Sequence, residues 1–172
     1  TMWTPTVNIY RDPRWGRGIE TYGEDPYLTS VMGVNVVKGL QCMDANQKYD
    51  KIHACAKHFA VHSGPEWNRH EFNAENIKPR DLHETYLVPF EALVKEAKVK
   101  EVMCAYNRLE GVHTGFRAVG RLRNVDMQQR VVDALREEAV AALLHPVGMA
   151  RIGRKSRRER FGRNLVLAVN MG

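Results

Sequence analysis

Short apolar runs alternate with longer segments of helical period over the first two thirds of the chain. Residues 6–10, 52–60 and 101–106 are rich in apolar side chains and predict three strands. Between them lie two stretches whose apolar residues recur every three to four positions, as they do in helices packed on one face. Strands that alternate with helices are typical of βα units around a parallel sheet, so the pattern predicts an α/β fold.

The first predicted helix has a clear start signal. Asp25 is a favourable N-cap residue, and Pro26 is a favourable first helical residue. Apolar side chains then follow at every fourth position and predict one buried stripe, made of Leu28, Met32, Val36 and Leu40.

The second predicted helix opens at Pro79. Pro89 should kink it, because proline lacks the N–H group that continues a helix. Residues 61–78, just upstream, are polar and show no clear period. The buried stripe of this helix is predicted at Leu82, Tyr86, Phe90, Leu93 and Ala97.

The composition of the chain changes near Gly115. Residues 1–114 hold 14 Lys and Arg against 15 Asp and Glu, whereas residues 115–172 hold 12 against 5, so the net charge of +6 originates in the tail. We expect residues 1–114 to form one partial domain and residues 115–172 a divergent basic tail. The spacing of apolar residues in the tail predicts one helix at residues 127–144. The Arg-rich run 151–163 has too few apolar residues to fold alone. A shifted reading frame or a fusion would explain such a tail.

Length and composition limit the classes of protein to consider. A chain of 172 residues that is 44% hydrophobic can bury one core. It has no run of eighteen apolar residues, so we expect no membrane partner. Three cysteines, an odd number, argue against a disulfide scaffold. The sequence leaves the cellular compartment open.

Polar side chains cluster where each predicted strand ends. Residues 11–17 follow the first strand, Lys57 and His58 close the second, and Tyr106 and Asn107 close the third. Loops after the strands of consecutive βα units share one face of the sheet, so these groups should meet. A sugar site needs many hydrogen-bond donors, often charged, together with aromatic faces. The pattern therefore favours a site for a neutral, hydroxyl-rich ligand.

Three motifs in this order resemble family 3 glycoside hydrolases: RDPRWGR within TVNIYRDPRWGRGIETYGEDPYL, KHF within ACAKHFAVHSGPEWNRHEFNAE, and VMCAY within VMCAYNRLEG. The resemblance covers residues 3–114. It implies a partial (β/α)8 TIM-type barrel of about three βα units, followed by an Arg-rich tail that does not match. It also implies a β-linked oligosaccharide or glycoside as substrate, with no cofactor and no metal.

The resemblance also implies roles for individual residues. Arg17, Lys57 and His58 match the family positions that hydrogen-bond the sugar where cleavage occurs, and Met103 and Tyr106 match residues that line the same pocket.

Each of these residues also has a structural interpretation. Arg17 could instead form an ion pair with Asp12 or Glu20, the Lys57–His58 pair could make only structural hydrogen bonds, and Tyr106 could be a core aromatic residue. Trp67 is a further candidate for a neighbouring subsite.

The catalytic carboxylates implied by the family are not found in this sequence. The family mechanism is retaining: an Asp attacks the anomeric carbon, and a second carboxylic acid protonates the leaving oxygen. The expected Ser-Asp strand does not follow Gly111, and neither Asp126 nor Asp133 has a strand-end context. We therefore assign no catalytic residue and expect this chain alone to be inactive.

The function that follows is that of the parent enzyme, which releases terminal non-reducing β-linked glucose or xylose from oligosaccharides. The loop after KHF lacks the KHFPGHG pattern of the N-acetylglucosaminidase branch, which favours the glucosidase or xylosidase branch.

Two rival interpretations rest on other residues. One is a metal site, since five side chains that can bind metal lie within eighteen positions: His53, Cys55, His58, His62 and His70. Their spacing matches no closed zinc pattern. The Arg-rich tail could bind nucleic acid through phosphates, but no aromatic stacking platform accompanies it, and we expect no nucleic-acid partner.

Overall fold

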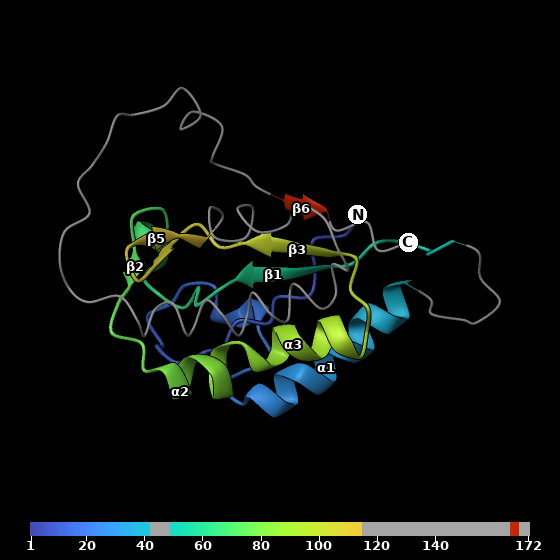
Figure 1. Cartoon of the computed structure of the whole chain (residues 1–172), viewed down its shortest axis with the longest axis horizontal. Helices are drawn as coiled ribbons and strands as arrows, with labels where there is room; N and C mark the ends of the chain where they lie inside the picture. The colour runs from blue at the N-terminus through green and yellow to red at the C-terminus, as the bar shows by residue number, and fades with distance from the viewer. Residues whose placement is uncertain (42–48, 115–165, 169–172) are drawn as a thin grey trace, which may run out of the picture.

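The computed structural model describes residues 1–41, 49–114 and 166–168. A three-stranded sheet and two helices form its main part: the helices pack against each other, and the second of them also contacts the sheet (Figure 1). The helices are α1 (Pro26–Gln41) and α3 (Val88–Lys95), and the sheet has the strand order β1-β3-β6. No helix in the described ranges has the length and apolar character that crossing a bilayer requires.

Two parallel strands form the centre of this sheet. β1 (Cys55–Phe59) pairs with β3 (Glu101–Cys104), and Lys57 lies opposite Met103 in the register. Both strands were predicted, although each is shorter than its apolar run. β6 (Val166–Ala168) adds an antiparallel edge to β3, which the sequence pattern did not predict.

The predicted strand at residues 6–10 is wrong as a continuous strand. The N-terminal segment runs beside β1 with only isolated bridges, at Met2 and Thr6. The Val7 N–H donates to the carbonyl of Lys57 at 2.8 Å, and beyond this point the Asn8 side chain, not the backbone, bonds the N–H and C=O of His58. From Asn8 onward, side-chain hydrogen bonds take the place of the backbone hydrogen bonds that would continue a strand. The apolar run is therefore not a continuous strand.

Helix α1 begins as predicted. The Oδ1 of Asp25 accepts hydrogen bonds from the N–H groups of Tyr27 at 2.7 Å and Leu28 at 3.2 Å, and Pro26 is the first residue of the helix. These bonds satisfy donors that a helix start leaves without partners.

The predicted buried stripe of α1 is wrong at Leu28 and Met32, whereas Val36 and Leu40 are partly buried and Leu40 packs against the core. Leu28 is 47% exposed and Met32 is 44% exposed. The buried face of α1 is shifted by one position along the chain, and α1 packs against α3. Most residues of this face are small: the buried residues are Thr29, Ser30, Gly33, Val34, Val37 and Gln41.

The second helix is interrupted before the predicted kink at Pro89. It starts at Pro79 as α2 (Pro79–Asp81), continues as a π-helical turn η3 (Leu82–Tyr86), and becomes α3. The N–H of Leu87 donates to the carbonyl of Leu82, five residues back, at 3.0 Å. Pro89 has no N–H for the preceding turn, so the irregular turn lies on its N-terminal side. All five predicted stripe residues are buried.

A second, smaller sheet closes the end of the molecule that lies beyond β1 and β3 (Figure 1). It contains β2 (Asn73–Ala74), β4 (Arg108–Leu109) and β5 (Val112–His113). The polar stretch 61–78, which shows no clear period in the sequence, supplies β2 and a short 3-10 helix η2 (Glu66–Asn68). The predicted tail helix at 127–144 and the Arg-rich run 151–163 lie outside the described residues.

Candidate functional site

Arg17 ends the loop after the N-terminal segment and precedes the 3-10 helix η1 (Gly18–Glu20). Its guanidinium pairs with the Glu20 carboxylate through two bonds of 2.7 Å, Nε to Oε1 and Nη2 to Oε2. The Glu20 hydrogen bond raises the pKa of Arg17. The ion pair considered from the sequence is therefore present with Glu20, whereas Asp12 pairs with Arg14. The contact leaves Nη1 of Arg17 outside the pair.

Lys57 and His58 are neighbours on β1. Burial lowers the pKa of the half-buried Lys57, and the nearby Arg17 charge adds to this effect while the Glu20 charge opposes it. Burial, followed by the charges of His62, Arg17, Lys57 and Arg69, lowers the pKa of His58 to about 2. The charge of Arg17 thus acts on both Lys57 and His58, which indicates that the three side chains share one region.

Met103 and Tyr106 come from the third strand and its end. Met103 is buried on β3 directly opposite Lys57. The Tyr106 ring lies 4.7 Å from the ring of His70, and the Arg69 guanidinium lies 5.7 Å from its centroid. Tyr106 is only partly buried and lies outside the apolar core cluster, so it is not a core aromatic residue.

A buried aromatic group beside His58 was not predicted as part of the site. The His62 ring lies 4.9 Å from His58 and makes an edge contact with Trp15 at 5.6 Å. Burial lowers the pKa of His62 to about 4, although the Glu66 carboxylate, 3.7 Å from its Nε2, opposes the shift. Glu66 also pairs with Arg69.

The sequence held a partial signal for this group, because Trp15 belongs to RDPRWGR and His62 follows KHF by three residues. Trp67, the subsite candidate named from the sequence, is 88% exposed.

The chemistry of this cluster suits hydroxyl groups. Arg17 and Lys57 are donors, the Glu20 carboxylate is an acceptor, and a neutral imidazole has one donor and one acceptor nitrogen. A hydroxyl both donates and accepts, so it can be bound between groups of the two kinds. Among the described residues, no group of three or more His, Cys, Asp or Glu side chains is arranged to hold a metal ion.

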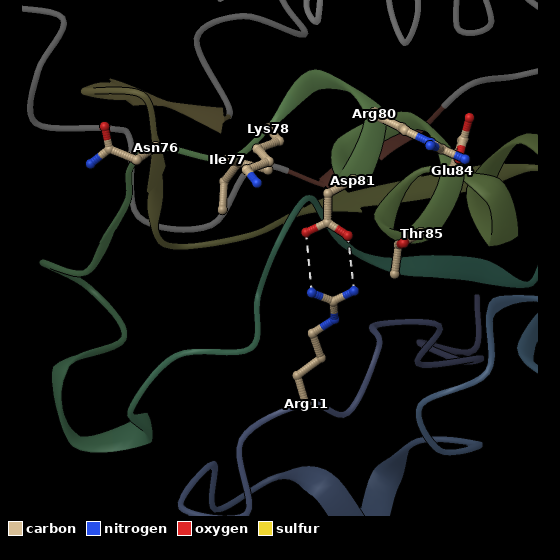
Figure 2. A pocket seen from close by; sticks show the side chains of 8 residues that line it. All are labelled: Arg11, Asn76, Ile77, Lys78, Arg80, Asp81, Glu84 and Thr85. Carbon is tan, nitrogen blue, oxygen red and sulfur yellow. Dashed lines mark hydrogen bonds and ion pairs between the residues drawn. The ribbon is translucent and has the colours of Figure 1, made fainter.

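A cavity of about 510 Å³ lies elsewhere, beside α2 and η3, and none of the five predicted site residues lines it. Figure 2 shows the Arg11 guanidinium reaching the Asp81 carboxylate through two bonds, of 2.9 and 3.1 Å. Arg80 pairs with Glu84 at 2.7 Å on the same wall. Two acidic and two basic side chains of this cavity are thus paired with each other, Arg11 with Asp81 and Arg80 with Glu84.

Known proteins resemble the chain in sequence over about two thirds of its length. A xylan 1,4-β-xylosidase from Xylanibacter ruminicola is 66% identical over 110 residues, which is 64% of this chain and 13% of that protein. β-D-Xylosidase 1 of Arabidopsis thaliana is 46% identical over 117 residues, or 66% of this chain and 15% of that protein. The chain therefore spans about one seventh of the length of these curated relatives.

Solved structures agree in fold. A family 3 exo-β-xylosidase (XlnD), in complex with a xylobiose aziridine activity-based probe, superposes with a TM-score of 0.60 at 40% identity, over 66% of this chain and 15% of that chain. β-Glucosidase 3B from Thermotoga neapolitana, in complex with glycerol, gives a TM-score of 0.56 at 37% identity over the same shares.

The family model of the glycosyl hydrolase family 3 N-terminal domain matches residues 1–145. The predicted α/β class is confirmed, and the parallel strands and helices described above are part of a TIM-type barrel. This chain belongs to glycosyl hydrolase family 3.

Proposed function

We propose that this chain contributes part of the sugar-binding site of a retaining β-glycosidase that releases terminal xylose or glucose from oligosaccharides. The observation that supports the proposal is that Lys57 and His58 are adjacent on β1 and both feel the charge of Arg17, which adds to burial, the largest cause, in lowering the pKa of each. Met103 lies beside Lys57, and Tyr106 lies near enough to affect the pKa of Arg17.

Xylose is the first candidate sugar. Relatives that are 66% and 46% identical to this chain are named as xylosidases, and a family 3 exo-β-xylosidase with a xylobiose-derived probe shares the fold. Glucose is the second candidate, because β-glucosidase 3B from Thermotoga neapolitana shares the fold at 37% identity.

The proposal divides the reaction between this chain and other parts of the enzyme. Retaining hydrolysis needs a nucleophilic carboxylate and an acid/base carboxylic acid about 5 Å apart. We assign neither role to the described residues. Arg17, Lys57 and His58 would instead hold hydroxyls of the sugar, which fixes the anomeric carbon for attack.

The first test compares two arginines of the same loop. Xylose and glucose are titrated into the full 172-residue chain and into its Arg17→Met and Arg14→Met variants. Binding is measured from the changes in NMR chemical shifts. Loss of a charged hydrogen bond should weaken binding about tenfold or more in Arg17→Met. Arg14 is exposed and pairs with Asp12, so its variant should bind as the parent does. Equal affinity of the two variants for both sugars would contradict the proposal.

The same titration at increasing salt separates a sugar site from the nucleic-acid alternative. A neutral sugar releases no counterions, so its binding should not change with salt, whereas nucleic acid bound by the Arg-rich tail would dissociate steeply.

A further inference from the structure

Asn8 is a buried polar residue, 3% exposed, whose side-chain amide contacts His58 three times. Its Oδ1 accepts the backbone N–H of His58 at 2.8 Å, and its Nδ2 donates to the backbone carbonyl of His58 at 2.8 Å. The same Oδ1 lies 3.2 Å from Nδ1 of the His58 ring. The amide thus bonds both the backbone and the ring of one proposed sugar-binding residue.

These bonds fix the orientation of the amide. A backbone N–H can only donate and a backbone carbonyl can only accept, so the oxygen and nitrogen of Asn8 cannot be exchanged. The atom facing Nδ1 of His58 is therefore an acceptor. A hydrogen bond between two atoms needs one donor, so the proton of this contact belongs to Nδ1.

The environment of His58 keeps its ring neutral. The side chain is 2% exposed, and the charged or titratable groups that act on it are Arg17, Lys57, His62 and Arg69, all of which disfavour a second proton. A neutral imidazole that carries its proton on Nδ1 has a lone pair on Nε2.

We propose that Asn8 is a positioning residue that holds His58 in the Nδ1–H tautomer, so that Nε2 accepts a hydrogen bond from a sugar hydroxyl. This inference rests on the proposed function for its ligand. The bound hydroxyl would donate to His58 and accept from Arg17 or Lys57, so the site would require a hydroxyl that can donate. A fluorine at the same position of the sugar cannot donate and would be rejected.

The tautomer is measurable without any sugar. The full chain is labelled with 15N at histidine, and long-range proton–nitrogen correlations report which ring nitrogen of His58 carries the proton. The expected result is a protonated Nδ1 and an unprotonated Nε2 from pH 7 down to pH 5. A His58 ring protonated on Nε2, or an even mixture of tautomers, in the unmodified chain would overturn the inference.

Variants then test the role of Asn8. Asn8→Ala should shift His58 toward a mixture of tautomers, whereas Asn8→Asp, which keeps an acceptor at this position, should retain the proton on Nδ1. Asn35→Ala is the control, because the Asn35 amide bonds only the Val31 carbonyl on α1 at 2.8 Å. An unchanged tautomer in folded Asn8→Ala would count against the positioning role. If Asn8→Ala does not fold, the measurement on the unmodified chain still decides.

The outcomes separate this inference from the proposed function. If xylose and glucose fail to bind while His58 carries its proton on Nδ1, the sugar site is wrong and the role of Asn8 in fixing the tautomer remains. If a sugar binds to a His58 ring protonated on Nε2, the site is right and the inference about Asn8 is wrong.

Discussion

His58 and His62 are buried imidazoles close to the charges of Arg17 and Arg69, and His62 also lies beside the Glu66 carboxylate. Burial is the largest cause of the low pKa of each, and Arg17 and Arg69 add to it. The folded protein therefore holds both rings neutral at pH values where free histidine takes up a proton. Because both rings stay neutral in the folded protein, the stability of the fold should depend on pH.

We predict that the free energy of unfolding falls as the pH is lowered from 7 to 5. Unfolded histidine binds a proton near pH 6.5, whereas folded His58 and His62 stay neutral until the pH approaches about 2 and about 4. In this window the unfolded state binds more protons, so stability is lost as the pH falls, by up to about 1.4 kcal/mol per pH unit for each ring.

Urea unfolding at pH 7 and pH 5 measures this loss. His62→Asn should lose less stability between the two pH values than the parent chain, because one of the two buried rings no longer titrates. Asn35→Ala, which removes an exposed side chain of α1 that does not titrate, is the control and should behave like the parent. An identical pH dependence in all three proteins would contradict the assignment.

Helix α1 shows which parts of an element a sequence pattern can predict. Its start was predictable because Asp25 and Pro26 act within one turn of chain. Its buried face was not, because the choice between Leu28 and Gly33 depends on where α3 lies in space. The face that contains Gly33 packs against α3, whereas Leu28 and Met32 remain exposed.

The same limit applies to the candidate site. Arg17, Lys57 and His58 were predicted as site residues from motifs and strand ends, which are local signals, and their role stays a prediction. Asn8 was missed, because its role depends on the backbone of a residue 50 positions away.

The α1–α3 contact gives a prediction at two glycines of one helix. A methyl group at Gly33 would lie 2.8 Å from Cδ1 of Leu93 and 3.0 Å from Cγ1 of Val7, whereas one at Gly39 would meet no atom of the described residues within 4 Å. Gly33→Ala should therefore destabilise the fold by about 1–3 kcal/mol. Gly39→Ala, the matched control, should stabilise it by up to about 1 kcal/mol. Urea titrations that rank the two variants in the opposite order would refute this packing.

The exposed face of α1 predicts self-association. Tyr27, Leu28, Val31 and Met32 are all exposed on this helix, and large exposed apolar surfaces promote aggregation. Met32→Lys should reduce association in sedimentation velocity while changing the free energy of unfolding by less than about 0.5 kcal/mol. Asn35→Lys adds the same charge at an exposed polar position and should have a smaller effect. Equal effects of the two substitutions would show that charge, not apolar surface, controls association.

At the scale of the whole molecule, the chain is part of a TIM-type barrel of glycosyl hydrolase family 3. The fold class and the family were predictable because the motifs RDPRWGR, KHF and VMCAY occur in a fixed order along βα units. The small sheet of β2, β4 and β5 was not, because its strands are two residues long and carry no periodic signal.

We proposed that this chain supplies sugar-binding residues and that the catalytic carboxylates lie in other parts of the enzyme. This proposal predicts that the chain alone does not hydrolyse a glycoside. Aryl β-xylosides and β-glucosides incubated with the full chain should release no phenol above the rate without protein. Release that disappears in Asp126→Asn or Asp133→Asn would assign a nucleophile to the tail and contradict this prediction.

The central claim is that Arg17, Lys57 and His58 bind one sugar. Backbone and side-chain NMR shifts of the full chain, recorded during a xylose titration, test it most directly. The account predicts that the largest changes occur at these three residues and at Tyr106, while Arg11 and Asp81 of the cavity in Figure 2 stay constant. Changes confined to the Arg11–Asp81 cavity, or scattered over the surface with no change at His58, would contradict it.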